Sequence, residues 1–451
     1  MDRGIRNEDA ALDLTKFFSL LGIDKEDITK IKDEIQNVQC SENVAQELCR
    51  ILKICDSNKS YSHCLLYLPT VLKCHELGKA EISKLVNVFP VFLLHRLLDI
   101  SSSAEFDEGF ELVISVLSVL LSNGSETDIS NFTDIIQPLY YAIVSKKIWN
   151  SVSLENACLA FIALIGENST SKQLINLLNL IANELKMNSD QLPSVNILGC
   201  IVNIIEKLMN SSDFISCKNI SKGSWSADLR IVIRRLLQTP HINFDYHLKS
   251  FLIVSLIVYI VDIEWFEDDP DFMLLLASLA LVQFHSLLTD PKYANNLENL
   301  TACVRLMESF FEFGESTTVL NDDQATILSL QCHKSLIFIC DYLIQSYKSP
   351  TEIYLDLESQ MILTELLCCF LSYGGLEALS KKQHNDLISY LFEIARKAML
   401  NKRFNLFGKI LLNLPRFQKL PKSCLGIITD ALDLHRSLSG KGTDDLPLKD
   451  A

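Results

Sequence analysis

Apolar residues recur at helical spacing along most of this chain. Leu, Ile, Val and Phe return every three or four positions, and short stretches rich in Ser, Asn, Asp and Gly separate the apolar segments. This pattern predicts amphipathic α-helices joined by short turns. The predicted helices include two within residues 8–37, followed by 41–55, 61–72, 80–98, 107–122, 128–145, 151–166, 171–187, 193–210, 227–238, 244–263, 270–288, 293–313, 322–347, 353–372, 380–400, 403–413 and 421–437.

The order of these helices predicts an all-α fold. Helix pairs that return about every 40 residues are typical of armadillo and HEAT arrays, in which each pair buries its apolar face against its neighbours. We therefore expect an armadillo/HEAT-like α-solenoid of stacked helix pairs. Residues 1–210 form a predicted N-terminal helical array, the polar stretch 211–226 a connecting loop, residues 227–438 a C-terminal array and residues 439–451 a disordered tail.

Composition supports this prediction. The 451 residues include only 15 Gly and 11 Pro, too few for the many turns of a sandwich or barrel. The longest apolar run, Phe251–Val261, is shorter than the ~20 residues that a membrane span needs, and the run Met273–Leu288 is interrupted by Gln283 and His285. Both runs predict buried helices, and we expect no transmembrane segment.

Charge and cysteine usage narrow the expected partners and compartment. The net charge of −15 argues against nucleic acid, whose phosphates attract Lys and Arg, and favours basic or apolar protein partners. The first residues lack the apolar core of a secretory signal. The 14 cysteines are scattered through apolar helical stretches, which predicts reduced, mostly buried thiols and a cytoplasmic protein.

No segment carries a nucleophile elbow, a phosphate loop, metal-ligand spacing or a cofactor fingerprint. The pairs His63-Cys64 and Cys74-His75 are adjacent residues, which diverge by about 100° on a helix and do not converge on a zinc ion. Gly440–Thr443 follows no predicted strand and opens no helix, so it is no phosphate loop. We expect no catalytic residue, no cofactor and no metal.

The clearest basic patch contains Arg230, Arg234 and Arg235, with Lys218 and Lys222 just upstream. Arg230 and Arg234 are four residues apart on a predicted helix and are candidates for binding a phosphate or carboxylate of a partner. The alternative is that these arginines form ion pairs within the molecule.

An acidic segment contains Glu264, Glu267, Asp268, Asp269 and Asp271, and it lacks the alternating ligands and central Gly of a calcium loop. We select Glu267, Asp268 and Asp269 as candidates for contact with a basic partner. The alternative is a solvated loop between helices, with its two aromatic residues packed inward.

Two segments carry ordered sets of features. The first, Leu48–Leu121, has a polar break at Asp56–Ser60, then Leu65-Leu66, Val71-Leu72-Lys73, Glu81-Ile82, Phe89, Phe92 and Arg96-Leu97-Leu98, before a long apolar helix. The second has Ser224-Trp225, Glu264-Trp265, the Ala- and Leu-rich stretch Phe272–Leu281, and Thr301-Ala302-Cys303 with Leu306-Met307-Glu308. In this order the segments resemble the N-terminal and middle regions of neurochondrin family proteins.

The resemblance implies an armadillo-like, non-enzymatic cytoplasmic scaffold connected with neurite outgrowth and with receptor and kinase signalling at neurites and synapses. Two departures matter. This chain is shorter than typical members, and its first residues lack the cysteines through which some members resemble lipid-anchored proteins, which leaves peripheral membrane association open.

The leading hypothesis is therefore a scaffold that binds segments of signalling proteins such as receptor tails or kinases. The alternative is a transport adaptor or GTPase regulator built on the same helical array.

Overall fold

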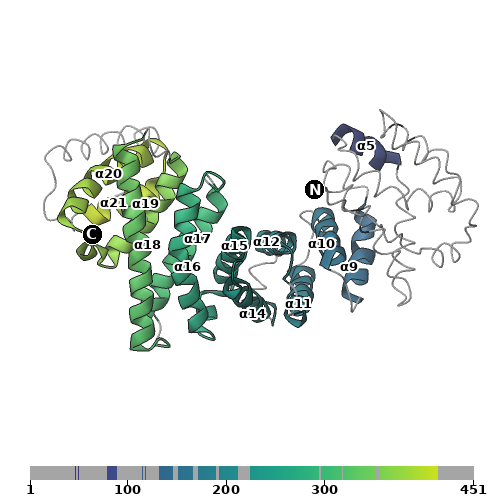
Figure 1. Ribbon diagram of the computed structural model, residues 1–451. Helices are drawn as coiled ribbons and strands as arrows, with labels where there is room; N and C mark the ends of the chain where they lie inside the picture. Colours follow the sequence, from purple (N-terminus) through teal and green to yellow (C-terminus); the bar gives the residue numbers. More distant parts are fainter. Residues whose placement is uncertain are drawn as a thin grey trace, which may run out of the picture. The chain divides into compact units, whose positions relative to one another are not determined.

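The structure is a computed structural model, and it describes residues 79–88, 132–145, 151–165, 171–188, 192–211, 224–293, 296–316, 318–350 and 355–414, with four single helical positions at Gln46, Cys49, Ile114 and Leu117. All regular elements in these ranges are helices, which confirms the all-α prediction. The α-helices are α5 (Lys79–Val88), α9 (Ile136–Ser145), α10 (Ser151–Ile165), α11 (Ser171–Met187), α12 (Val195–Asn210), α14 (Ser224–Gln238), α15 (Phe244–Val261), α16 (Pro270–Thr289), α17 (Leu297–Ser316), α18 (Asp322–Lys348), α19 (Leu357–Ser372), α20 (Lys381–Leu400) and α21 (Phe404–Asn413) (Figure 1). Three short 3-10 helices are η1 (Thr133–Ile135), η2 (Ile263–Phe266) and η3 (Gly375–Ala378).

The chain divides into two compact units, Met1–Val232 and Ile233–Ala451. In the first unit, α10 packs against α9 and α12, and α11 packs against α12. The facing sides of these helices are apolar and fully buried, for example at Phe161, Leu178 and Ile201. The unit is therefore held together by burial of the predicted apolar faces.

In the second unit, alternate helices lie side by side in two layers. One layer contains α15, α17, α19 and α21, and the other contains α16, α18 and α20 (Figure 1). Three hydrogen-bonded residue pairs connect α19 to α21 and its N-cap Arg403, and their members are 44 or 45 positions apart. Two hydrogen-bonded pairs connect α16 to α18, and their members are 53 or 54 positions apart. A nearly constant separation means that neighbours within a layer run parallel.

The helix starts follow local capping chemistry. Asn321 and Ser380 each form a reciprocal capping box with a Gln three residues later, at the starts of α18 and α20. Asp269 accepts a hydrogen bond from the Phe272 amide, and Pro270 occupies the first turn of α16. Such signals explain why most predicted boundaries agree with the structure to within a few residues.

Helix α14 begins three residues earlier than predicted. Asn179 on α11 explains this, because its Oδ1 accepts hydrogen bonds from the Ser224 hydroxyl and from the Trp225 amide, both at 3.0 Å. The Trp225 ring is fully buried. A contact with a residue 46 positions away therefore orders the first turn, within the stretch predicted as a loop.

Three described helices, α15, α16 and α18, are long and apolar enough to cross a membrane by length and composition. Half or more of each apolar window is buried inside the molecule. Helix α15 extends the apolar run at Phe251–Val261 back to Phe244, and Asp262, with a φ of 86°, ends it.

Several sequence predictions fall outside the described residues. They include His63-Cys64, Cys74-His75, Lys218, Lys222, Gly440–Thr443, the tail at 439–451, most of Leu48–Leu121 and the predicted helix at 421–437.

Candidate partner-binding groove

The three arginines of the predicted basic patch have different surroundings. Arg230 is buried, with 6% of its surface exposed. Arg235 is half-buried. Arg234 donates from Nη1 to both carboxylate oxygens of Asp269, at 2.7 and 2.6 Å.

The acidic segment supplies the carboxylate of this ion pair, Asp269. Glu267 and Asp268 are exposed in the turn between η2 and α16, whereas Trp265 and Phe266 are buried beneath them. Asp269 both caps α16 and accepts the Arg234 hydrogen bonds. Two residues selected separately from the sequence, Arg234 and Asp269, thus bind each other, as the alternative of pairing within the molecule predicts.

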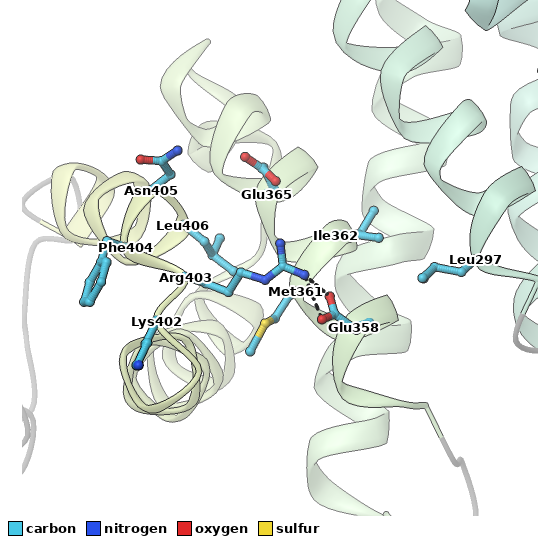
Figure 2. Close-up of a pocket in the computed structure, with 10 residues that line it drawn as sticks. All are labelled: Leu297, Glu358, Met361, Ile362, Glu365, Lys402, Arg403, Phe404, Asn405 and Leu406. Carbon is cyan, nitrogen blue, oxygen red and sulfur yellow. Dashed lines mark hydrogen bonds and ion pairs between the residues drawn. The ribbon is translucent and has the colours of Figure 1, made fainter. Parts of the chain in front are cut away.

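A groove of about 700 Å³ lies elsewhere in the second unit, between α19 and α21 and beside the start of α17. Half of its lining is apolar, from Leu297, Met361, Ile362, Phe404 and Leu406. The polar lining residues are Glu358, Glu365, Lys402, Arg403 and Asn405. In Figure 2 these side chains surround Arg403 and Leu406, with Lys402 and Phe404 on one rim and Leu297 and Ile362 on the opposite one.

The turn between α20 and α21 forms one side of this groove. The Lys402 amide donates to the Met399 carbonyl and the Arg403 amide to the Ala398 carbonyl, so both close the end of α20. Lys402 has a φ of 60°, in the left-handed region where Gly is usual. The exposed Lys402 therefore occupies a strained position at the rim of the groove.

Two ion pairs join α21 to α19 at the groove. Arg403 donates from Nη2 to both oxygens of Glu358, each at 2.7 Å, and this hydrogen bond raises the pKa of Arg403 (Figure 2). Lys409 donates to Glu365 at 2.5 Å. Burial, the largest single effect, lowers the pKa of Lys409, but the hydrogen bond to Glu365 and the nearby charges of Glu365 and Glu308 together outweigh it, so the net direction is upward. The two carboxylates of the groove are therefore already neutralised by cations of this chain.

Charged and aromatic side chains continue across the same layer of helices. Arg305 on α17 lies over the ring of Tyr259 on α15, 5.8 Å from its centroid. Burial raises the pKa of Glu308 on α17, and the charge of Glu365 raises it further, while Lys409 opposes this shift. These side-chain interactions connect α15 to α17, and α17 to α19 and α21.

Four buried or half-buried thiols of the second unit are protonated at neutral pH. Burial raises the pKa of Cys332, Cys340 and Cys368 to about 12 and that of the half-buried Cys369 to about 11. None of these is an activated nucleophile, because nucleophilic attack requires the thiolate. Across the part of the chain that the structure describes, no three His, Cys, Asp or Glu side chains form a group that could hold a metal ion.

Sequence reasoning did not find the groove. Its lining comes from three stretches around 297, 358–365 and 402–406, and only the packing of α17, α19 and α21 brings them together. The one local signal was the turn Asn401–Arg403, which the sequence indicated only as a break between two helices. The strained backbone of Lys402 in this turn is shown only by its φ angle in the structure.

No family model matches the chain, and no curated protein matches it. Among solved structures, the chain is similar to an engineered protein whose crystal structure was determined by a structural genomics consortium. The identity is 13%, the TM-score is 0.43, and the match covers 89% of this chain and 95% of the other. A likeness at this distance carries no argument about function.

Proposed function

We propose that this protein is a non-enzymatic α-solenoid scaffold that binds segments of other proteins in the groove between α19 and α21. The groove itself carries this proposal. Its volume of about 700 Å³ accommodates several side chains, its lining combines apolar residues with a polar rim, and it lies on parallel helices that fix its shape.

The energetics of such a site would rest on few residues. Apolar anchors of a partner would contact Met361, Ile362 and Leu406, where water is displaced, while the ion pairs at the rim contribute mainly orientation. Phe404 is 47% exposed and offers an aromatic surface at the rim. A short segment of a partner therefore suits the groove better than a second folded domain.

The partner class in the proposal comes from the resemblance to neurochondrin family proteins. On that basis the protein is a cytoplasmic, armadillo-like scaffold for signalling proteins, such as receptor tails or kinases, with a role in neuron projection development. The alternative remains a transport adaptor or GTPase regulator on the same helices.

Proximity labelling with the full chain in its native cells tests the proposal. The groove variant combines Ile362→Ser with Phe404→Ser, and Leu412→Ser is the matched control, because Leu412 is 77% exposed on α21 and does not line the groove. We expect the groove variant to lose a set of neighbours that the control retains. Identical neighbours for all three proteins would contradict binding through the groove.

The identity of the lost neighbours separates the two functions. Receptor or kinase neighbours favour the signalling scaffold. A small GTPase that is captured in a nucleotide-dependent way in a pull-down favours the adaptor or regulator.

A further inference from the structure

We infer that the groove between α19 and α21 selects a segment in which a carboxylate side chain, Asp or Glu, lies next to apolar residues, and that Lys402 determines this selectivity. This inference rests on the proposed function, because it names the chemistry of the partner that the groove binds.

The first argument is the balance of hydrogen-bond donors and acceptors. Both oxygens of Glu358 accept from Arg403, and Glu365 accepts from Lys409. Arg403 uses only Nη2 in these bonds, so among the described residues its Nε and Nη1 donors remain available. Arg403 therefore keeps donors for a ligand that supplies acceptor oxygens.

The second argument is charge. Of the four charged side chains that line the groove, Glu358, Glu365 and Arg403 form ion pairs, and Lys402 forms none with the residues that the structure describes. A partner carboxylate finds Lys402 without displacing anything. A basic partner residue must compete with Arg403 or Lys409 for carboxylates already bound at 2.7 and 2.5 Å.

The surrounding acidic charge does not reverse this argument. The chain carries a net charge of −15, but charges separated through water by more than about 8 Å are screened at physiological ionic strength. The groups that a bound segment contacts directly therefore decide its charge preference.

The third argument is the backbone at Lys402. A φ of 60° costs a lysine conformational energy that a glycine would avoid, and the Lys402 side chain is exposed at the rim beside Phe404 (Figure 2). The Lys402 charge forms no ion pair with the residues that the structure describes, so it is available to an anionic group of a partner.

The apolar part of the site completes the description of the ligand. Met361, Leu406 and, on the side away from Lys402, Ile362 and Leu297 line the groove around Arg403 (Figure 2). A segment with Leu-, Ile- or Phe-like side chains next to its carboxylate would contact these residues while the carboxylate lies at the Lys402 rim.

Selection from a library of displayed random 16-residue peptides, carried out with the full-length protein, tests the inference. We expect enriched peptides to contain Asp or Glu next to apolar residues, and their affinity to fall at least about tenfold for Lys402→Glu with Arg403→Gln. The matched control combines Lys382→Glu with Arg396→Gln on α20, because Lys382 is exposed and Arg396 forms a surface ion pair outside the groove. The control should bind like the wild type.

Lys402→Gly separates binding from folding. This variant relieves the backbone strain, so we expect a higher Tm together with weaker peptide binding. A lysine with a purely structural role would give the opposite relation, a lower Tm with unchanged binding.

The outcomes separate the inference from the proposed function. Enriched peptides that are basic, or that bind the Lys402 and Arg403 variants unchanged but lose binding with Ile362→Ser and Phe404→Ser, overturn the inference and leave the groove as a binding site. Peptides that bind only when phosphorylated assign the site to phosphate and also overturn it. The absence of any peptide sensitive to the groove variants contradicts both.

Discussion

The ion pair between Arg234 and Asp269 decides whether these two residues serve the fold or a partner. Asp269→Ala removes the cap of α16, which costs about 1 kcal/mol, and also the Arg234 pair, which is worth about 0.5–1 kcal/mol because both side chains are partly exposed. We therefore expect a total loss of stability of about 2 kcal/mol. Asp269→Asn keeps an oxygen for the cap and should lose only the contribution of the pair.

A double-mutant cycle isolates the pair. Urea unfolding of the wild type, Arg234→Met, Asp269→Ala and the double variant should give a coupling of about 0.5–1 kcal/mol, provided that circular dichroism and tryptophan emission show coincident transitions. The coupling should decrease in 1 M salt, where the screening length falls to about 3 Å. Additive effects within ~0.3 kcal/mol would refute the reasoning and return Arg234 to the list of residues available to a partner.

Three further predictions concern the second unit. Gly375→Ala should lower stability by about 1–3 kcal/mol in thermal unfolding, because a Cβ there overlaps the buried Phe370 ring, and no loss would mean that the ring moves freely. Burial raises the pKa of Cys369 to about 11, so its thiol should react with iodoacetamide at pH 8 far more slowly than the thiol of glutathione does. The reaction rate of Cys369 should increase as the pH rises toward 11. Equal rates for the two thiols at pH 8 would contradict the burial argument. Glu308→Gln should raise the Tm at pH 7, because burial raises the pKa of Glu308 and its ionised form therefore disfavours folding. This gain in Tm should disappear below the ordinary pKa of Glu, where the carboxyl is protonated in both the folded and the unfolded state. A gain that stays constant down to pH 3 would exclude this cause.

Local sequence signals were sufficient for most boundaries of the described helices. Asp269-Pro270 marks the start of α16, and Ser380 with Gln383 marks the start of α20, because caps act within one turn. The end of α15 was less well predicted. The helix stops at Val261, where Asp262 takes a positive φ and its carboxylate accepts the Ile263 amide, a conformation that the apolar pattern does not reveal.

Contacts between distant residues were not predictable in the same way. The sequence identified Arg234 and Asp269 as charged candidates, but not as partners, because they are 35 residues apart and no periodicity specifies which helices face each other. In the second unit, the interval between neighbouring helices of one layer was also underestimated. Successive helices of one layer begin at Phe244, Leu297, Leu357 and Phe404, farther apart than the expected ~40 residues.

The groove follows from the way in which α19 and α21 are held in register. Asn413 donates to the Cys368 carbonyl in the buried part of this interface, whereas Arg403 and Lys409 contact Glu358 and Glu365 at its exposed edge. Polar pairs at an exposed edge contribute little stability, so the apolar interior and the Asn413 hydrogen bond hold the two helices together. A parallel pair of helices that is apolar within, and whose rim carboxylates are already paired, therefore offers a partner segment a rigid floor, which lowers the ordering cost of binding a short peptide.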